Sequence, residues 1–508
     1  MNKILSPIFV ILILIFAIAF AVSCGSAVKG DELTGQPQPP DQSKADANVT
    51  DQADLEPHML DTVRNEHWTG DIDGMLQRRY IRAIVVYNKT NFFYDGPRTR
   101  GVSFDALTEF EKFLNKRLQT GSEPIHIIFI PVTREEAIKR MQDGRGDIAV
   151  GNIPIMAELE KIVDFSDPLR EHAQQLVIAG PNAPQINVID DLSGKEIYIR
   201  KFSRYWLTIE KLNEKLKRDR KPPVMLREAD ANLEDEDIIN MVAAGQLPMT
   251  ITDDLTAGLW AKVFPELRVY AQIPLVEDDR MGWAVQNGAT NFLKLINEFV
   301  KDHKQGTAFG NSVLASYLQT TKWATNNTEP AEMEKYKAAA SLFKKYGEIE
   351  GIDARLIAAQ AYQESQIDQS RVSPAGAVGV MQIKPSTAAD DPINIKDVDT
   401  NMENNIHAGT KYLQYIAQRY FSDPQLSQLD RTLFSFASYN AGPAKIAKLR
   451  AEAKQEGLDP NKWFGNVELV AGHEIGVETV NYVSNIYKYY IAYKVAFETV
   501  NTRKHLVH

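Results

Sequence analysis

Cysteine is the scarcest residue of this chain, because Cys24 is the only one among 508 residues. A disulfide within the chain is therefore excluded. The nine histidines are scattered and form no close pair at the spacing of metal ligands, so the sequence predicts no metal site and no cofactor. A glycine-rich loop that opens a strand–helix unit and could hold phosphate is lacking too.

An excess of positive charge is also lacking. The 57 Lys and Arg residues are outnumbered by 67 Asp and Glu residues, which gives a net charge of −10. We therefore expect no nucleic-acid partner. The 44% hydrophobic and 24% charged residues are typical of a globular protein, and the length suggests two or three domains.

Residues 1–24 combine an early lysine with a long apolar run, which is the pattern of an export signal. The run ends in Ala21-Val22-Ser23 before Cys24, which resembles the lipobox of bacterial lipoproteins. That resemblance implies a lipidated Cys24 and a chain held on the periplasmic side of the outer membrane, with which Gly25 is compatible. An uncleaved membrane anchor is the alternative, since the apolar run is nearly long enough to span a bilayer.

Residues 25–78 are rich in Asp, Gln, Pro and Ala and poor in apolar residues, a composition typical of a disordered tether. A flexible chain of this length spans on the order of 40 Å. The domain boundaries that we predict are a signal peptide at 1–24, the tether at 25–78, an α/β domain at 79–305, a linker at 306–330 and a helical domain at 331–508.

Short β-type runs alternate with helical stretches in residues 79–305. This alternation predicts an α/β fold with a largely parallel sheet. Gly146–Val150 and Val163–Pro168 resemble the GxxD turn and the "DFSxPY" segment of periplasmic solute-binding proteins of the amino-acid-binding type. The resemblance implies two lobes with a ligand cleft between them, and crossovers near Leu176–Pro181 and Val269–Leu275.

One departure concerns the ligand of this domain. Amino-acid-binding relatives carry an arginine just before the "DFS" segment, which suits a ligand carboxylate. An ungapped match places Leu159 there. Two interpretations stay open: the domain senses another small ligand, such as a muropeptide from the cell wall, or it is a ligand-free spacer.

A glutamate on the buried face of a helix is the main candidate for chemistry. Residues 353–368 read as an amphipathic helix with Asp353 as its N-cap. A carboxyl in an apolar stripe has a raised pKa, which a general acid needs near neutral pH. A loop of small residues follows at 373–379, where backbone can approach a ligand closely. The residues that share this helix face are Leu356, Ile357, Gln360, Ala361 and Glu364.

Four sequence blocks in order resemble the signature of the soluble-lytic-transglycosylase domain, which is similar to goose lysozyme. They are Glu364-Ser365, Gly379–Gln382, Ser438–Gly442 and Glu478–Val483. The chain is thus expected to be multidomain, with a bilobal α/β solute-binding-type domain followed by an all-α lysozyme-like domain. Helices are predicted at 332–346, 353–368, 401–421, 431–439, 443–456 and 475–500.

The resemblance implies a single acid that cleaves peptidoglycan glycan strands. Glu364 would protonate the oxygen between MurNAc and GlcNAc. As a carboxylate it would then take the proton of the C6 hydroxyl, which closes a 1,6-anhydro ring without water. Asp368, one turn later, is interpreted as a capping or turn residue rather than as a second catalytic carboxylate.

The loop residues receive roles from the same match. Ser373 and Gln382 would hydrogen-bond the sugar near the cleaved bond, and Met381 would pack beneath the site. Ser365 and Gly379 are expected to be structural.

The last two blocks supply four further residues. Tyr439 and Asn440 would face the developing oxocarbenium ion. Glu478 and Tyr482, at i and i+4 on the last helix, would close the site. The alternative for Tyr439 and Tyr482 is ordinary aromatic core.

Two other functions stay open at this point. A muramidase would use the same acid but add water and leave reducing ends. A cell-wall-fragment sensor with an inert helical domain is the other, although the intact Glu364 and its four blocks argue against inertness.

Overall fold

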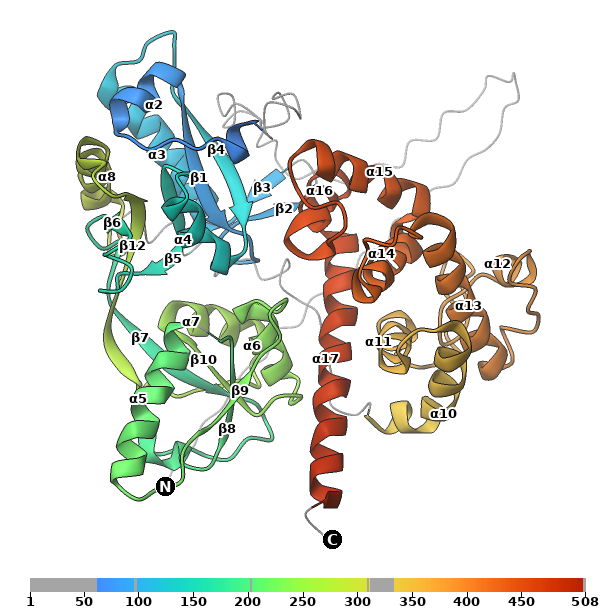
Figure 1. The fold of residues 1–508 in the computed structure, drawn as a ribbon. Coiled ribbons are helices and arrows are strands. Elements are labelled where there is room, and N and C mark those ends of the chain that lie inside the picture. The colour runs from blue at the N-terminus through green and yellow to red at the C-terminus, as the bar shows by residue number, and fades with distance from the viewer. Residues whose placement is uncertain (1–61, 96–97, 202, 308–309, 311–332, 506–508) are drawn as a thin grey trace, which may run out of the picture. The chain divides into compact units, whose positions relative to one another are not determined.

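The computed structural model describes residues 62–95, 98–201, 203–307, 310 and 333–505 (Figure 1). Cys24, the predicted signal peptide and most of the predicted tether and linker lie outside these residues.

A parallel three-stranded core begins the first lobe of the α/β domain. β1 (Tyr80–Val86) lies between β4 (His126–Val132) and β5 (Ile148–Pro154), and both pairings are parallel. The predicted β-type runs form these strands because their side chains are buried on both faces of the sheet. The other elements of this lobe are α2 (Ile72–Arg78), β2 (Phe93–Asp95), β3 (Arg98–Arg100), α3 (Val102–Leu118), α4 (Arg134–Gln142), β6 (Val163–Phe165) and α8 (Thr290–His303).

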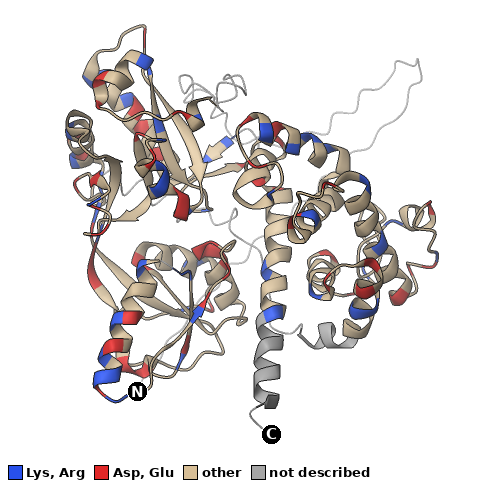
Figure 2. Cartoon of the chain, in the orientation of Figure 1, with Lys and Arg blue, Asp and Glu red and all other residues tan. Residues whose placement is uncertain are grey.

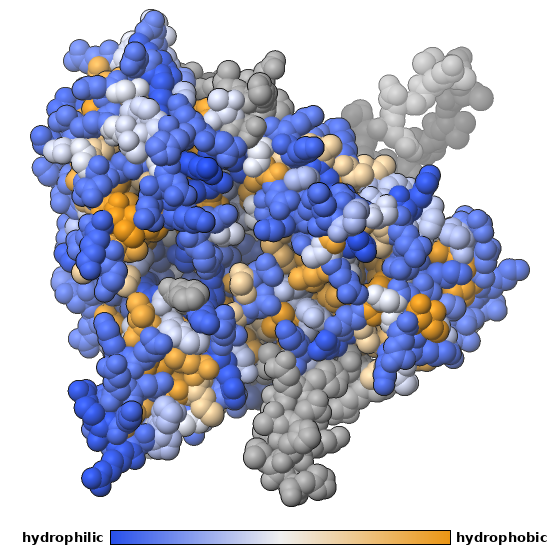
Figure 3. Space-filling model, in the orientation of Figure 1, coloured by the Kyte–Doolittle hydropathy of each residue, from blue (hydrophilic) through white to orange (hydrophobic). Residues whose placement is uncertain are grey.

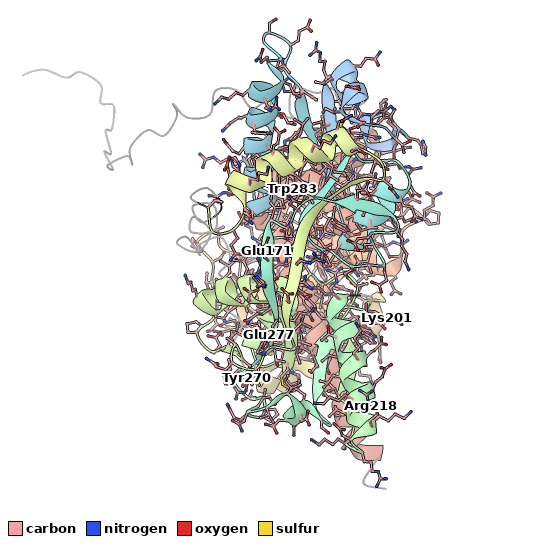
Figure 4. All side chains as sticks on the ribbon, turned by 90° about the vertical axis from the view of Figure 1, so that its left-hand side faces the viewer. Glu171, Lys201, Arg218, Tyr270, Glu277 and Trp283 are labelled. Atoms are coloured by element: carbon pink, nitrogen blue, oxygen red, sulfur yellow. The ribbon has the colours of Figure 1, made fainter. Side chains whose placement is uncertain are left out.

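Two long strands cross from this lobe to the second, and Figure 4 shows them running between the lobes. They are β7 (Arg170–Ala179) and β12 (Val276–Gln286), and they pair antiparallel to each other. β12 pairs antiparallel with β5 at one end, and β7 pairs antiparallel with β10 (Met249–Asp253) at the other. The sheet is therefore mixed rather than largely parallel, because two crossings in opposite directions must lie antiparallel.

The second lobe contains its own small apolar core. Ile197, Ile209, Leu216 and Ile251 are among its buried residues. The two-lobed α/β architecture expected from the sequence is thus confirmed, although the first expected crossover starts within β7 and the second ends just before β12. The remaining elements of this lobe are β8 (Glu196–Ile199), α5 (Arg204–Arg218), β9 (Met225–Glu228), α6 (Asp235–Ala243), α7 (Asp254–Val263) and β11 (Arg268–Val269).

The C-terminal part is helical, as predicted. Its long last helix packs against the helix that carries Glu364. That helix ends three residues earlier than expected, because Gln366 and Ile367 have left-handed backbone angles. The helices are α10 (Met333–Glu350), α11 (Ala354–Ser365), α12 (Pro385–Ala389), α13 (Met402–Tyr420), α14 (Gln428–Ala441), α15 (Pro443–Gln455), α16 (Glu468–Ile475) and α17 (Val477–His505).

The surface is polar and mixed in charge. Acidic and basic residues are interspersed over the chain in Figure 2, and hydrophilic residues cover most of the face in Figure 3. Within the described ranges no helix is both long and apolar enough to cross a membrane.

Candidate active site

Helix α11 presents Glu364 in its last turn. The helix starts at the predicted cap, where the carboxylate of Asp353 accepts the backbone N–H of Arg355 at 2.9 Å. Ile357 and Ala361, on the face shared with Glu364, are fully buried. The helical period therefore places one carboxyl at the edge of a packed apolar stripe, as the sequence indicates.

The electrostatics of Glu364 are those of an acid near neutral pH. Burial raises the pKa of Glu364 to about 7, although the Tyr482 hydrogen bond and the charge of Arg371 both act to lower it. The hydroxyl of Tyr482 donates to Glu364 Oε1 at 2.5 Å. A carboxyl with this pKa is protonated in a large fraction of molecules at pH 7 and can still lose its proton.

The loop after α11 is fastened by buried polar side chains. Ser365 Oγ donates to the carbonyl of Val380 at 2.8 Å. Asn405 on α13 accepts the N–H of Met381 at 2.8 Å and donates to the carbonyl of Val378 at 2.8 Å. Gly379 has φ +73°, and a Cβ there would lie 2.3 Å from the Asn405 amide nitrogen, so only glycine fits.

Met381 and Tyr439 meet below this loop. Met381 is fully buried, and the hydroxyl of Tyr439 on α14 donates to its carbonyl at 2.8 Å. Asn440 follows with its side chain exposed and accepts the hydroxyl of Thr479 on α17 at 2.7 Å. The hydroxyl proton of Tyr439 is therefore committed to the backbone rather than to a ligand.

The amide and hydroxyl groups expected to bind sugar also have contacts within the loop. Ser373 Oγ accepts the N–H of Ala377 at 2.9 Å, which leaves its own proton for another acceptor. Gln382 donates through Nε2 to the carbonyls of Gly379 and Arg371. Glu478 lies exposed in the first turn of α17 and does not hydrogen-bond Glu364 or Tyr482.

Asp368 is a turn residue, as its position after the helix indicates. Its side chain is exposed, and Oδ1 accepts both the N–H and the hydroxyl of Ser370, at 2.8 and 2.7 Å. The geometry thus gives Glu364 no catalytic carboxylate partner from its own helix turn.

Sequence reasoning missed two buried amides near Glu364. Asn405 supports the loop from 24 residues away, and Gln360 donates to the hydroxyl of Tyr482 at 3.1 Å. Gln360 was visible on the shared helix face, but nothing in the sequence shows which distant side chain it meets. No short motif signals Asn405.

A second candidate site lies between the two lobes of the α/β domain. A cavity of about 140 Å³ is lined by apolar side chains such as Val102, Trp283 and Met281, together with Arg170 and Asp253. Trp283 lies on β12 near the first lobe (Figure 4). Leu159, which replaces the expected arginine, packs against the first-lobe core and does not line the cavity.

The charges of this cavity compensate one another. Arg170, at the first-lobe end of β7, donates to Asp253 at 2.8 Å and to Asp254 at 2.7 Å, and both aspartates belong to the second lobe. Burial acts to raise the pKa of Asp253, but Arg170 and Arg204 hold it well below its usual range. Arg200 of the second lobe pairs with Glu135 of the first. The lobes are therefore joined by their own ion pairs.

Two family models match the chain. Residues 86–311 match bacterial extracellular solute-binding proteins, family 3, and residues 341–462 match the transglycosylase SLT domain. Fold, site and matches define a class of protein in which a solute-binding domain precedes a helical domain that cleaves peptidoglycan.

Two relatives are similar to this chain over most of its length. A Pseudomonas putida protein described as membrane-bound lytic murein transglycosylase F is 30% identical over 437 residues, which cover 81% of this chain and 84% of the relative. A Desulfosudis oleivorans protein of the same description is 25% identical over 432 residues, with 80% and 88% covered. The chain belongs to the membrane-bound lytic murein transglycosylase F family and is a peptidoglycan lytic transglycosylase.

Solved structures similar to this chain cover about half of it. An ancestral arginine-binding protein bound to arginine is 20% identical with a TM-score of 0.39, and covers 47% of this chain and 98% of its own. A mutant of ArgBP from T. maritima is 18% identical with a TM-score of 0.40, and covers 49% and 99%.

The raised pKa of Glu364 predicts a pH-dependent gain in stability for Glu364→Gln. Between the pKa of an unfolded glutamate and about 7, the unfolded chain is ionised while the native carboxyl keeps its proton, so wild-type stability falls as pH rises. The variant lacks this titration. We expect its free energy of unfolding at pH 8 to exceed that of wild type by about 2 kcal/mol, with a much smaller gain at pH 5.

Urea denaturation of both proteins at the two pH values measures this difference. Glu478→Gln is the matched control, since it makes the same chemical change at an exposed carboxyl of α17. An equal gain for Glu364→Gln at pH 5 and pH 8 would contradict a raised native pKa.

Proposed function

We propose that this enzyme cleaves the β-1,4 bond between MurNAc and GlcNAc and forms 1,6-anhydroMurNAc, with Glu364 as acid and then as base. The observation that carries the proposal is a single carboxyl of raised pKa at the end of α11, beside an Asp368 that is tied to its own turn.

The proton of Glu364 moves twice in this mechanism. The protonated carboxyl gives its proton to the glycosidic oxygen, and the bond from that oxygen to C1 of MurNAc breaks. The carboxylate then takes the proton of the C6 hydroxyl as its oxygen bonds to C1. Glu364 ends protonated, so the cycle is closed without water. The nucleophile is part of the substrate, which gives the step an intramolecular advantage.

The tyrosine beside the acid supports the second half of this cycle. Tyr482 donates to Oε1 of Glu364, and a donor of this kind favours the carboxylate that exists after the first proton transfer. Met381, Tyr439 and Asn405 hold the loop next to it. Ser373, Gln382, Asn440 and Glu478 remain our proposed sugar contacts, with the free hydroxyl proton of Ser373 as the best-placed donor.

Digestion of purified peptidoglycan tests the proposed product. The full chain in detergent should release muropeptides that carry the anhydro ring, read by mass spectrometry, and Glu364→Gln should release about a thousandfold less or none. Activity should fall as pH rises through about 7, because the general acid must be protonated. Products with reducing ends would instead establish a hydrolytic muramidase.

We infer that the solute-binding domain regulates the enzyme by binding a muropeptide or another small cell-wall fragment in the cavity between its lobes. The cavity supports this proposal by its apolar walls and its position between two lobes joined by ion pairs that can open. The alternative is a spacer that binds nothing.

The last helix provides a physical link for such regulation. Tyr482 on α17 contacts the catalytic acid, and Tyr487 on the next turn donates its hydroxyl to Asp230 of the second lobe at 3.0 Å. Lys488 lies 3.7 Å from Asp237 at the start of α6. A shift of the second lobe therefore acts on the helix that sets the environment of Glu364.

Soluble muropeptides should raise the melting temperature of the full chain by several degrees at saturation. Ala106→Phe fills the cavity and should abolish the shift, whereas Lys112→Phe, on the exposed face of the same helix, should leave it unchanged. No shift in wild type would establish the spacer interpretation.

We also propose that Cys24 is lipidated and tethers a periplasmic enzyme to the outer membrane. The proposed domain boundaries are those predicted from the sequence. Wild type should incorporate labelled palmitate and sediment with outer membranes, and Cys24→Ala should not incorporate the label. An unlabelled wild type that keeps residues 1–23 would point to an uncleaved anchor.

A further inference from the structure

Gln360 is a polar side chain where the packing of α11 calls for an apolar one. It lies on the buried face with Ile357 and Ala361, and all three are fully buried. A buried carboxamide is costly unless its hydrogen bonds are made. Its presence therefore points to a role for the amide.

The amide lies one helical turn before the catalytic acid. Because Gln360 and Glu364 are at i and i+4, both reach the same turn of α17. Gln360 Nε2 donates to the hydroxyl oxygen of Tyr482 at 3.1 Å, and that hydroxyl donates to Glu364 Oε1 at 2.5 Å. The three side chains form one directed chain of hydrogen bonds.

The direction of this chain depends on the amide. The hydroxyl of a tyrosine has one proton to donate. A donor such as Gln360 Nε2 binds a lone pair of the hydroxyl oxygen and does not use that proton. The proton is thereby left for Glu364. If the amide turned over, its oxygen would compete for the same proton and Glu364 would lose its donor.

We propose that Gln360 is a positioning residue for the general acid, which fixes the hydroxyl of Tyr482 on Glu364. The inference rests on the proposed function of Glu364 and deepens it. The hydrogen bond from Gln360 acts to lower the pKa of Tyr482, whose pKa burial and Glu364 raise, and so makes Tyr482 a better donor. The carboxylate that exists between the two proton transfers is stabilised by that donor.

The other groups that face Glu364 do not replace this contact. Arg371, in the loop after α11, is exposed and acts on the carboxyl through its charge. Tyr439 on α14 directs its hydroxyl to the carbonyl of Met381. Tyr482 is therefore the neutral donor on the acid, and Gln360 is the residue that orients it.

Gln360→Leu tests the proposal, since it keeps the size of the side chain and removes the amide. Without Gln360 the hydroxyl of Tyr482 stabilises the carboxylate less, so the pKa of Glu364 should rise by about half a unit. Tyr482→Phe should raise it by about one unit. The double variant should match Tyr482→Phe alone, because Gln360 acts only through that hydroxyl.

Two readouts keep this test separate from that of the proposed function. The first is the pH above which the stability gain of Glu364→Gln stops growing, measured with and without Gln360→Leu, which reports the pKa of Glu364 in the folded protein whether or not the enzyme is active. The second is the fall of glycan cleavage at high pH, which should move upward by the same half unit.

The matched control is Ile357→Val, which disturbs packing on the same buried face without touching a hydrogen bond. This variant should lower the free energy of unfolding, but the pH dependence of stability and of glycan cleavage should stay as in wild type. Gln360→Met is the second variant if Gln360→Leu does not fold. An unchanged pH dependence in the folded variant, or a double variant that shifts further than Tyr482→Phe, would overturn the positioning role. If Gln360→Leu shifts the pH dependence of stability but wild type cleaves no glycan, the proposed function is overturned and the positioning role of Gln360 is supported.

Discussion

The hydrogen bond between Glu364 and Tyr482 joins two helices whose contacting residues are 118 positions apart. It exists because α11 and α17 pack together, and that packing also removes the water that would hold the carboxyl at its ordinary pKa. The same contact thus creates the acid and limits how far its pKa rises. Ser365, Gly379 and Asn405 hold the adjoining loop against this pair, so the site is fixed by buried polar groups on several elements.

The part of the site that follows helical period was predictable from the sequence. The period placed Glu364 on a buried face, and the chain after it gave Asp368 as a turn residue. The pairings of Asn405 with Met381 and of Gln360 with Tyr482 were not predictable, since each joins elements that only the fold brings together. The side chains of Gln382 and Tyr439 donate to backbone carbonyls of the loop after α11.

In the α/β domain too, features that follow from the local sequence pattern were predictable, whereas pairings between distant segments were not. Strand–helix alternation predicted the α/β fold, and the resemblance to solute-binding proteins implied its two lobes. The antiparallel crossing strands were missed because alternation describes only the parallel units. Leu159 stands where the family pattern has an arginine, and the arginine that lines the cavity is Arg170 of β7, which is held by two aspartates of the second lobe.

Regulation of such a site does not require any catalytic residue to move far. The pKa of Glu364 is raised by burial between α11 and α17, and α17 is a single helix that also contacts the second lobe through Tyr487. A small separation of the two helices would admit water, and the pKa would fall toward its ordinary value. At pH 7 the carboxyl would then be ionised and unable to protonate the glycosidic oxygen. Under the proposed regulation, a ligand that changed this packing would alter the fraction of competent acid by an amount that its differential affinity for the two arrangements sets.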